Sequence, residues 1–445
     1  MIIADTTTPV VVLNAYTHCA LTVVRSLGRL GVPMYAIHKT RKAPALRSKY
    51  WRGVLELSIE DMQRPEAVEA MLRFAKPIGG TPLLIPTEDA SCLFLEENAD
   101  ALRAAYRFPQ RPTGLAQALS SKRAMFDLCE RFDVPTPKAL FPRSREDVAG
   151  FAQTAVFPLM VKPVDNREVQ DLPGAGKAIV SSGHELLEVF DRFAARGSPP
   201  NLVLQEYIPG AADSVWMFNG YFDARSECLF GMTGKKLRQY PPYVGQTSLG
   251  ICEANPVVEE TTRRFMRAIG YTGILDIGYR YDARDGAYKL LDVNPRIGAA
   301  SRLFVADNGL DAARALYLDM TGQEVPGGWS ARGRKWFVEN YDLASSWEYR
   351  RDGGLRVREW VSSFRGVEEA AWFATEDIRP FGAMAIASAL YLARRLARSR
   401  TRRARGTSGR PDNNGHGPAQ SPIADRRMRN GGIPDGRVVE PSTAD

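Results

Sequence analysis

A short segment late in the chain brings together side chains that could bind a metal ion and a phosphate. It reads Lys-Leu-Leu-Asp-Val-Asn-Pro-Arg over residues 289–296. Because side chains alternate along a β-strand, Asp292, Asn294 and Arg296 fall on the same face. Oxygen donors suit Mg²⁺, and a guanidinium beside them could stabilise the charge that develops during phosphoryl transfer. The segment therefore predicts a magnesium and phosphate site.

A neighbouring strand is expected to complete this site. The pattern predicts a β-hairpin with strands over residues 274–281 and 288–293 and a turn at 284–286. Asp276 lies on the first strand, and a register of matching parity places it beside Asp292 and Asn294. Taken alone, the segment is better explained as a strand with an exposed acid, an Asn-Pro turn and a solvated arginine.

Two lysines and one further motif favour the functional interpretation. Lys122 begins a predicted helix over residues 122–132, and Lys162 lies in an apolar predicted strand over 159–163. Since burying an unpaired ammonium is costly, we expect an anionic partner such as a phosphate at Lys162. Gln-Glu-Tyr-Ile-Pro-Gly follows at residues 205–210. The ordered set is more specific than any of its members.

This ordered set resembles the ATP-grasp superfamily, and within it the carboxylate-amine ligases related to peptidoglycan D-aspartate ligase. The resemblance covers about residues 9–322, and it implies ATP and Mg²⁺, or Mn²⁺, as cofactors. It assigns Lys122 and Lys162 to the nucleotide phosphates, Gln205, Glu206, Tyr207 and Ile208 to the adenine pocket, Asp213 to the ribose, Asp276, Asp292 and Asn294 to the metal, and Arg296 to the transferring phosphoryl group.

A basic stretch precedes the hairpin. Residues 235–240 read Lys-Lys-Leu-Arg-Gln-Tyr, and a run of this kind is usually a solvated face. Similar stretches in the related ligases approach the phosphates and the acyl acceptor. The resemblance therefore implies catalytic roles for Lys236 and Arg238.

The resemblance implies that the segment Pro-Gly-Ala-Gly-Lys at residues 173–177 is a flap over the triphosphate that includes Lys177, with glycines that let backbone N–H groups approach the oxygens. It is not a Walker A loop, which needs Gly where Asp171 stands and Ser or Thr where Ala178 stands. A plain surface turn is the alternative.

The start of the chain predicts a Rossmann-like module. Its expected elements are a strand at 9–13, a helix at 20–30, a strand at 32–37 and a further strand at 83–85. The first strand-to-helix turn lacks the glycines of a dinucleotide site, which argues against a dehydrogenase. The resemblance places Asn14 and Thr17 of this turn where substrate could be touched, whereas a lone histidine such as His18 is more often structural.

The expected fold class is α/β and α+β, with several domains. We predict a Rossmann-like pre-ATP-grasp domain over residues 1–115, a two-lobed ATP-grasp domain over 116–325, a mixed segment over 326–378, an apolar-basic helix over 379–405 and a disordered tail over 406–445.

Composition narrows the partners and the compartment. The formal charge of +8 is local, since seven arginines lie between residues 394 and 405, so no specific nucleic-acid partner is expected. Five scattered cysteines without CxxC spacing and no signal-peptide pattern indicate the cytoplasm. The 14-residue apolar stretch at 380–393 is shorter than the ~20 residues that span a bilayer. Peripheral membrane contact is one interpretation, and a packed helix with a solvated basic end is the other.

The resemblance implies a ligase that phosphorylates a carboxylate with ATP and joins the acyl phosphate to an amine, releasing ADP and phosphate. D-aspartate is the first donor to test, with an amino group of a cell-wall precursor peptide as acceptor. The alternatives are a carboxylase or carbamoyl-phosphate-synthase-like enzyme, and a catalytically silent nucleotide-binding regulatory protein. A homo-oligomer is compatible with each, and no Ser-His-Asp or Cys-His set indicates a hydrolase.

Overall fold

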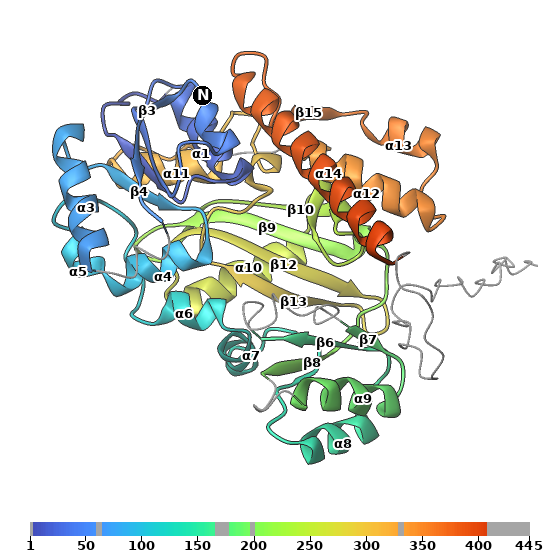
Figure 1. Cartoon of the computed structure of the whole chain (residues 1–445). Coiled ribbons are helices and arrows are strands. Elements are labelled where there is room, and N and C mark those ends of the chain that lie inside the picture. Colours follow the sequence, from blue (N-terminus) through green and yellow to red (C-terminus); the bar gives the residue numbers. More distant parts are fainter. Residues whose placement is uncertain (1–2, 59–64, 165–177, 196–200, 328–332, 407–445) are drawn as a thin grey trace, which may run out of the picture. The chain divides into compact units, whose positions relative to one another are not determined.

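The structure is a computed structural model that describes residues 3–58, 65–164, 178–195, 201–327 and 333–406. It divides into two compact units, Met1–Ser399 and Arg400–Asp445. The first unit contains three β-sheets with helices packed against them (Figure 1).

The first sheet forms the Rossmann-like module. It is parallel, in the order β3-β2-β1-β4, and comprises β1 (Val10–Leu13), β2 (Met34–His38), β3 (Trp51–Glu56) and β4 (Leu83–Pro86). Helices α1 (His18–Gly28), α3 (Pro65–Ala75), α4 (Asp89–Glu97) and α5 (Ala99–Leu102) belong to the same module. Its central strands are almost entirely apolar and buried, as both faces of a covered parallel sheet require. The predicted module is confirmed, and β3 is a strand that the pattern did not predict.

The second sheet is small and antiparallel. Its order is β5-β8-β6-β7, with β5 (Ala139–Leu140), β6 (Leu159–Pro163), β7 (Ala178–Val180) and β8 (Leu202–Glu206). Helices α8 (Arg145–Thr154) and α9 (Gly183–Ala194) pack on it around Val148, Leu186 and Phe190 (Figure 1). Two short helices, α6 (Leu115–Ser120) and α7 (Lys122–Arg131), precede it.

The third sheet has seven strands in the order β13-β12-β9-β10-β11-β14-β15. The strands are β9 (Val215–Phe222), β10 (Cys228–Tyr240), β11 (Gln246–Cys252), β12 (Gly273–Asp282), β13 (Ala287–Asn294), β14 (Lys335–Phe337) and β15 (Val367–Ala370). Helix α10 (Pro256–Ala268) packs Phe265 and Met266 into a core shared with Phe218 of β9, and α11 (Ala312–Met320) shares a core with α1. The predicted hairpin is β12 and β13.

The segment 326–378, left without a role by the sequence, extends this third sheet. Strand β14 pairs antiparallel with β11 and parallel with β15. Helices α12 (Glu339–Arg351) and α13 (Val357–Ser363) lie between the two strands in sequence. The final helix is α14 (Arg379–Gly406), and residues 407–445 of the expected disordered tail lie outside the described residues. Within the described ranges, no helix combines the length and apolar character needed to cross a bilayer.

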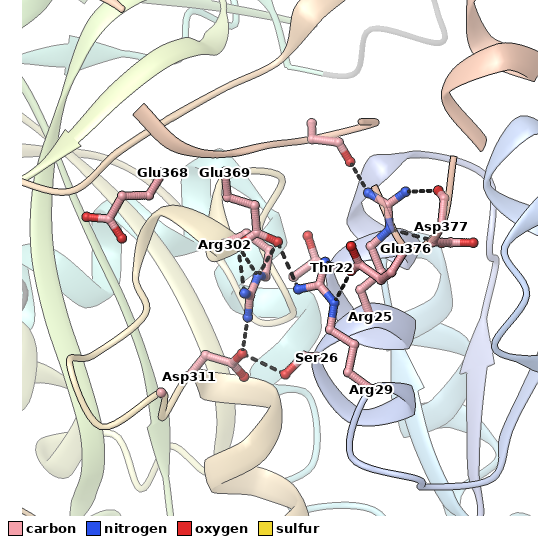
Figure 2. Close-up of polar contacts among 12 residues, drawn as sticks. Thr22, Arg25, Ser26, Arg29, Arg302, Asp311, Glu368, Glu369, Glu376 and Asp377 are labelled. Atoms are coloured by element: carbon pink, nitrogen blue, oxygen red, sulfur yellow. Dashed lines mark hydrogen bonds and ion pairs between the residues drawn. The ribbon is translucent and has the colours of Figure 1, made fainter. Parts of the chain in front are cut away.

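A buried set of ion pairs joins α1 to the end of this segment; we call it the ion-pair network (Figure 2). Arg25 of α1 is 2% exposed, and its Nε donates to Asp377 Oδ2 at 3.0 Å. The same guanidinium donates to the carbonyl oxygens of Ala371, Trp372 and Asp377. The buried guanidinium of Arg25 therefore has both a charged partner and carbonyl acceptors, as burial of a charge requires.

Glu369 of β15 is the second centre of the ion-pair network. Arg302 donates to it at 2.6 Å and also to Asp311 at 2.6 Å, while Arg29 and Arg334 approach Glu369 to 3.3 and 2.9 Å. Burial alone would raise the pKa of Glu369, but these guanidinium groups lower it to about 2. The network thus connects the first helix, the loop after the β12–β13 hairpin and the last strand of the large sheet.

Candidate active site

A cavity of about 570 Å³, within the usual range for small-molecule sites, brings most of the predicted site residues together. Its lining comes from the small sheet, the large sheet and the start of α7. The predicted residues that line it are Lys122, Lys162, Gln205, Glu206, Tyr207, Ile208, Lys236, Asp276, Asp292, Asn294 and Arg296. Residues that are distant in sequence therefore meet at one site.

The predicted metal ligands lie side by side on the hairpin. Asp276 of β12 is paired in register with Asn294 of β13, as the parity argument requires. The Asn294 amide donates to Asp276 Oδ2 at 3.3 Å and to Asp292 Oδ2 at 3.1 Å. Burial raises the pKa of Asp276 to about 6, Arg296 opposes this shift and Asp292 adds to it. Two carboxylates and an amide oxygen are donors that suit Mg²⁺.

Two glycines make room for these carboxylates, and the sequence reasoning did not identify them. A Cβ on Gly278 would lie 2.6 Å from Asp292 Oδ1, and a Cβ on Gly298 would lie 2.4 Å from Asp276 Cγ. Neither distance is sterically allowed, so only glycine lets the backbone pass so close to the acids. The signal in the sequence was a glycine on the hairpin strand and another shortly after Arg296.

Arg296 is held by a residue of the Rossmann-like module. Its Nε donates to Asp89 Oδ1 of α4 at 2.7 Å, and its Nη2 donates to Asn294 Oδ1 at 3.1 Å. Its side chain is only 17% exposed. Asp89 was not predicted, because it lies 207 residues away from Arg296 in the sequence.

Lys122 and Gln205, which the resemblance assigns to the nucleotide, both line the cavity. Lys122 is the first residue of α7, whose N-cap Ser121 accepts from the Ala124 amide, and its ammonium donates to the Val164 carbonyl at 3.4 Å. Gln205 is 5% exposed, and its Oε1 is buried without a hydrogen-bond partner in the structure. An unsatisfied acceptor in a cavity wall fits a ligand with an amino donor, such as adenine.

Glu206 lines the cavity, yet its carboxylate is engaged elsewhere. It pairs with Arg284 at 2.7 Å and lies 3.5 Å from Lys289, both on the hairpin. Its backbone amide donates to the Lys138 carbonyl at 2.8 Å. These contacts tie the end of β8 to the hairpin that carries the predicted metal ligands.

Lys236 and Arg238 point in different directions, although the alternation of a regular strand would place them on one face. The β10–β11 register shifts between Lys236 and Arg238 and again before Gln239. Lys236 lines the cavity, whereas Arg238 is buried and pairs with Asp342 of α12 at 2.8 Å. A β-bulge reverses the parity of the strand, so the structure does not bring Arg238 to the predicted site.

The predicted substrate residues of the first turn do not line this cavity. Asn14 has a φ of 64°, donates to Glu88, and its Oδ1 lies 2.8 Å from Nδ1 of His38. Thr17 is the N-cap of α1 and accepts from the Cys19 amide at 3.2 Å. Both contacts organise the turn itself.

His18 is buried among aromatic rings, and burial lowers its pKa to about 4. Asp213, in the short helix Ala212–Ser214, is exposed and is not part of the cavity lining. Lys177 and the rest of the predicted flap at 173–177 lie outside the described residues. Across the described ranges no three His, Cys, Asp or Glu side chains form a metal-binding group, so the predicted site rests on two acids and an amide.

Comparisons with known proteins agree with this architecture. No family model matches the chain. D-aspartate ligase of Enterococcus faecium is 28% identical over 262 residues, which cover 56% of this chain and 62% of that protein. The chain thus matches less than two thirds of that protein's length.

Solved structures share the fold. N5-carboxyaminoimidazole synthetase from Staphylococcus aureus aligns with a TM-score of 0.57 and 12% identity, covering 74% of this chain and 82% of that one. L-amino acid ligase from Bacillus licheniformis aligns with a TM-score of 0.53 and 15% identity, covering 71% of this chain and 75% of that one. The predicted ATP-grasp fold and the resemblance to D-aspartate ligase are both confirmed.

Proposed function

We propose that this chain is an ATP-dependent ligase that converts a carboxylate into an acyl phosphate and transfers the acyl group to an amine. One observation carries the proposal: Asp276, Asp292, Asn294 and Arg296 meet in a cavity that Lys122 and Lys162 also line. Oxygen donors for a cation and cationic groups for phosphates are what phosphoryl transfer needs at one place.

The residues present fit Mg²⁺ and a nucleotide. Asp276 and Asp292 offer hard carboxylate oxygens, and Asn294 carries an amide oxygen that accepts from Arg296 in the structure. The unsatisfied Gln205 Oε1 suits an amino group. Bound Mg-ATP supplies the phosphoryl group that replaces the charge of the carboxylate with a leaving group. Arg296, oriented by Asp89, is placed to stabilise negative charge on the transferred group.

The substrates are proposed on similarity. D-aspartate is the first donor to test because D-aspartate ligase of Enterococcus faecium is 28% identical to this chain over 262 residues. An amino group of a cell-wall precursor peptide is the corresponding acceptor, and the cytoplasm is the corresponding compartment. Mg²⁺ is the proposed metal, with Mn²⁺ able to replace it.

Hydroxylamine provides the test, because it converts acyl phosphates into stable hydroxamates without knowledge of the acceptor. The protein is incubated with Mg-ATP, hydroxylamine and a panel of D- and L-amino acids, other small carboxylates and bicarbonate, and ADP and hydroxamate are measured together. Asp292→Asn is the matched control. A hydroxamate formed from D-aspartate supports the specific proposal. A hydroxamate formed from another acid supports the ligase proposal and identifies that acid as the carboxylate substrate.

Two outcomes would contradict the ligase. ADP release that depends on bicarbonate and gives no hydroxamate with any other acid indicates a carboxylase-like enzyme. Nucleotide binding by folded protein without either product from a broad panel indicates a silent nucleotide-binding protein.

A further inference from the structure

The exposed apolar residues of this chain are concentrated in its last described part. Of the sixteen large apolar side chains that are exposed among the described residues, ten lie between Leu343 and Leu392. Helix α12 exposes Leu343 and Trp347, and α13 exposes Val357 and Val361. Each pair is four residues apart and therefore lies on one face of its helix. Large apolar patches on a soluble protein mark contact surfaces.

The strongest case is the middle of α14. Its first turns are anchored: Pro380 and Met384 are buried, and Met384 packs in the main core. The preceding residues, 371–377, are held by Arg25 of the ion-pair network. After Met384 the helix is exposed: of residues 385–393, Ser388 is half-buried and the other eight are exposed.

Residues 385–393 form an exposed and entirely uncharged stretch. Ile386, Leu390, Tyr391 and Leu392 are 64%, 53%, 64% and 56% exposed, and the others are alanines and Ser388. At 1.5 Å per residue this stretch is about 14 Å long, less than half of the ~30 Å hydrocarbon core. It is too short to cross a bilayer and long enough to lie in its surface.

The sequence that follows identifies the partner. Seven arginines occur between residues 394 and 405, still within the helix range of α14. If a second copy of this chain bound here, two basic runs of like charge would come close together. If nucleic acid bound the arginines, the apolar stretch would stay exposed to water. An anionic lipid surface matches both the apolar stretch and the basic run. We therefore infer that α14 is a docking helix that binds the chain to anionic membranes.

Flotation of the full-length protein tests this inference. Vesicles of phosphatidylcholine mixed with phosphatidylglycerol should carry the protein upward at low salt, and vesicles of phosphatidylcholine alone should not. Recovery should fall at ~1 M salt, where the Debye length shrinks to ~3 Å. The triple variant Ile386→Ser, Leu390→Ser, Leu392→Ser should reduce the bound fraction at least ~10-fold. A second variant, Arg394→Gln, Arg395→Gln, Arg398→Gln, should do the same.

The matched control is Val156→Ser with Val257→Ser, two side chains that are 56% and 55% exposed elsewhere on the chain. This variant should float like the wild type, and thermal melting should show that all variants are folded. Equal flotation of wild type and both α14 variants overturns the inference. So does the absence of flotation together with a dimer that the Ile386, Leu390 and Leu392 substitutions dissociate, because the helix would then bind a second copy.

Discussion

The cavity and the ion-pair network are both built from cationic side chains and carboxylates, but they balance charge differently. In the ion-pair network three guanidinium groups surround Glu369, and the pKa of this carboxyl falls to about 2. In the cavity burial raises the pKa of Asp276 to about 6, and the neighbouring acid Asp292 adds to this shift. Glu369 is thus satisfied by the chain itself, whereas the paired acids of the cavity favour an added cation. Charge clusters that look alike by composition can therefore serve packing in one place and binding in another.

Of the variants that test this contrast, Asp292→Asn is expected to have the largest effect, and the effect should be on turnover. The substitution removes one negative charge from the proposed metal site while keeping the shape of the side chain. We expect ADP production to fall ~10⁴-fold, the size of effect that loss of one transition-state charge has in phosphoryl transfer. The melting temperature should stay near that of the wild type, because Asp292 is exposed. Turnover close to wild type by the folded variant would remove the metal assignment.

The corresponding change in the ion-pair network is Arg25→Met. It leaves the buried Asp377 carboxylate without its charged partner and three carbonyl groups without the guanidinium donor, so we expect a loss of about 3–5 kcal/mol in the free energy of unfolding. Activity per folded molecule should change little, which is the opposite of Asp292→Asn. Denaturant unfolding and turnover at low temperature measure the two quantities. Arg29→Met, at a side chain that is 25% exposed, is the control and should cost less. An Arg25→Met variant that is as stable as the wild type but inactive would show that the ion-pair network serves activity and not stability.

The pH dependence of stability tests Glu369 directly. Its pKa is about 2 in the folded protein and 4.5 as the reference value, so its contribution is complete above pH 4.5 and is lost as the pH falls towards 2. The difference corresponds to a contribution on the order of 3 kcal/mol. Unfolding measured from pH 6 to pH 2 should show this loss, and Glu369→Gln should flatten the curve. Glu56→Gln, at a side chain that is 51% exposed, should leave the curve unchanged.

The smallest effect is expected from Gln205→Leu. The variant removes a buried acceptor that has no partner in the structure, so the melting temperature should stay the same or rise slightly. A nucleotide that uses this acceptor should bind ~10-fold more weakly, a loss of about 1.4 kcal/mol. Calorimetric titration with ADP measures this directly. Unchanged affinity would show that Gln205 does not contact the base.

The sequence predicted features that depend on neighbours along the chain or across one hairpin. The alternation of Asp292, Asn294 and Arg296, and the parity of Asp276, follow from strand geometry alone. The resemblance implied a catalytic role for Arg238, but a bulge in β10 reverses the parity of the strand and turns this side chain away from the cavity. Nothing in the residue pattern marks the bulge.

Contacts between distant segments could not be predicted. Asp89 of α4 in the Rossmann-like module contacts Arg296 after β13, and β14 joins the large sheet from a segment without a clear strand pattern. Such pairings depend on how the sheets pack, which periodicity does not report. The fold class and the charged residues at the centre of the cavity were therefore accessible from the sequence, and the partners that orient them were not.

The pairing of Arg25 with Asp377 also has a consequence for synthesis of the protein. The two residues are 352 positions apart, so Arg25 emerges from the ribosome long before its partner exists. At ~5–20 residues per second, the wait is roughly 20–70 s. During that time the nascent Rossmann-like module must keep a charged side chain in water on a face that is later buried. Translation speed and chaperone binding should therefore affect the yield of this chain strongly. The effect should be smaller for a protein whose N-terminal module pairs its buried charges within the module itself.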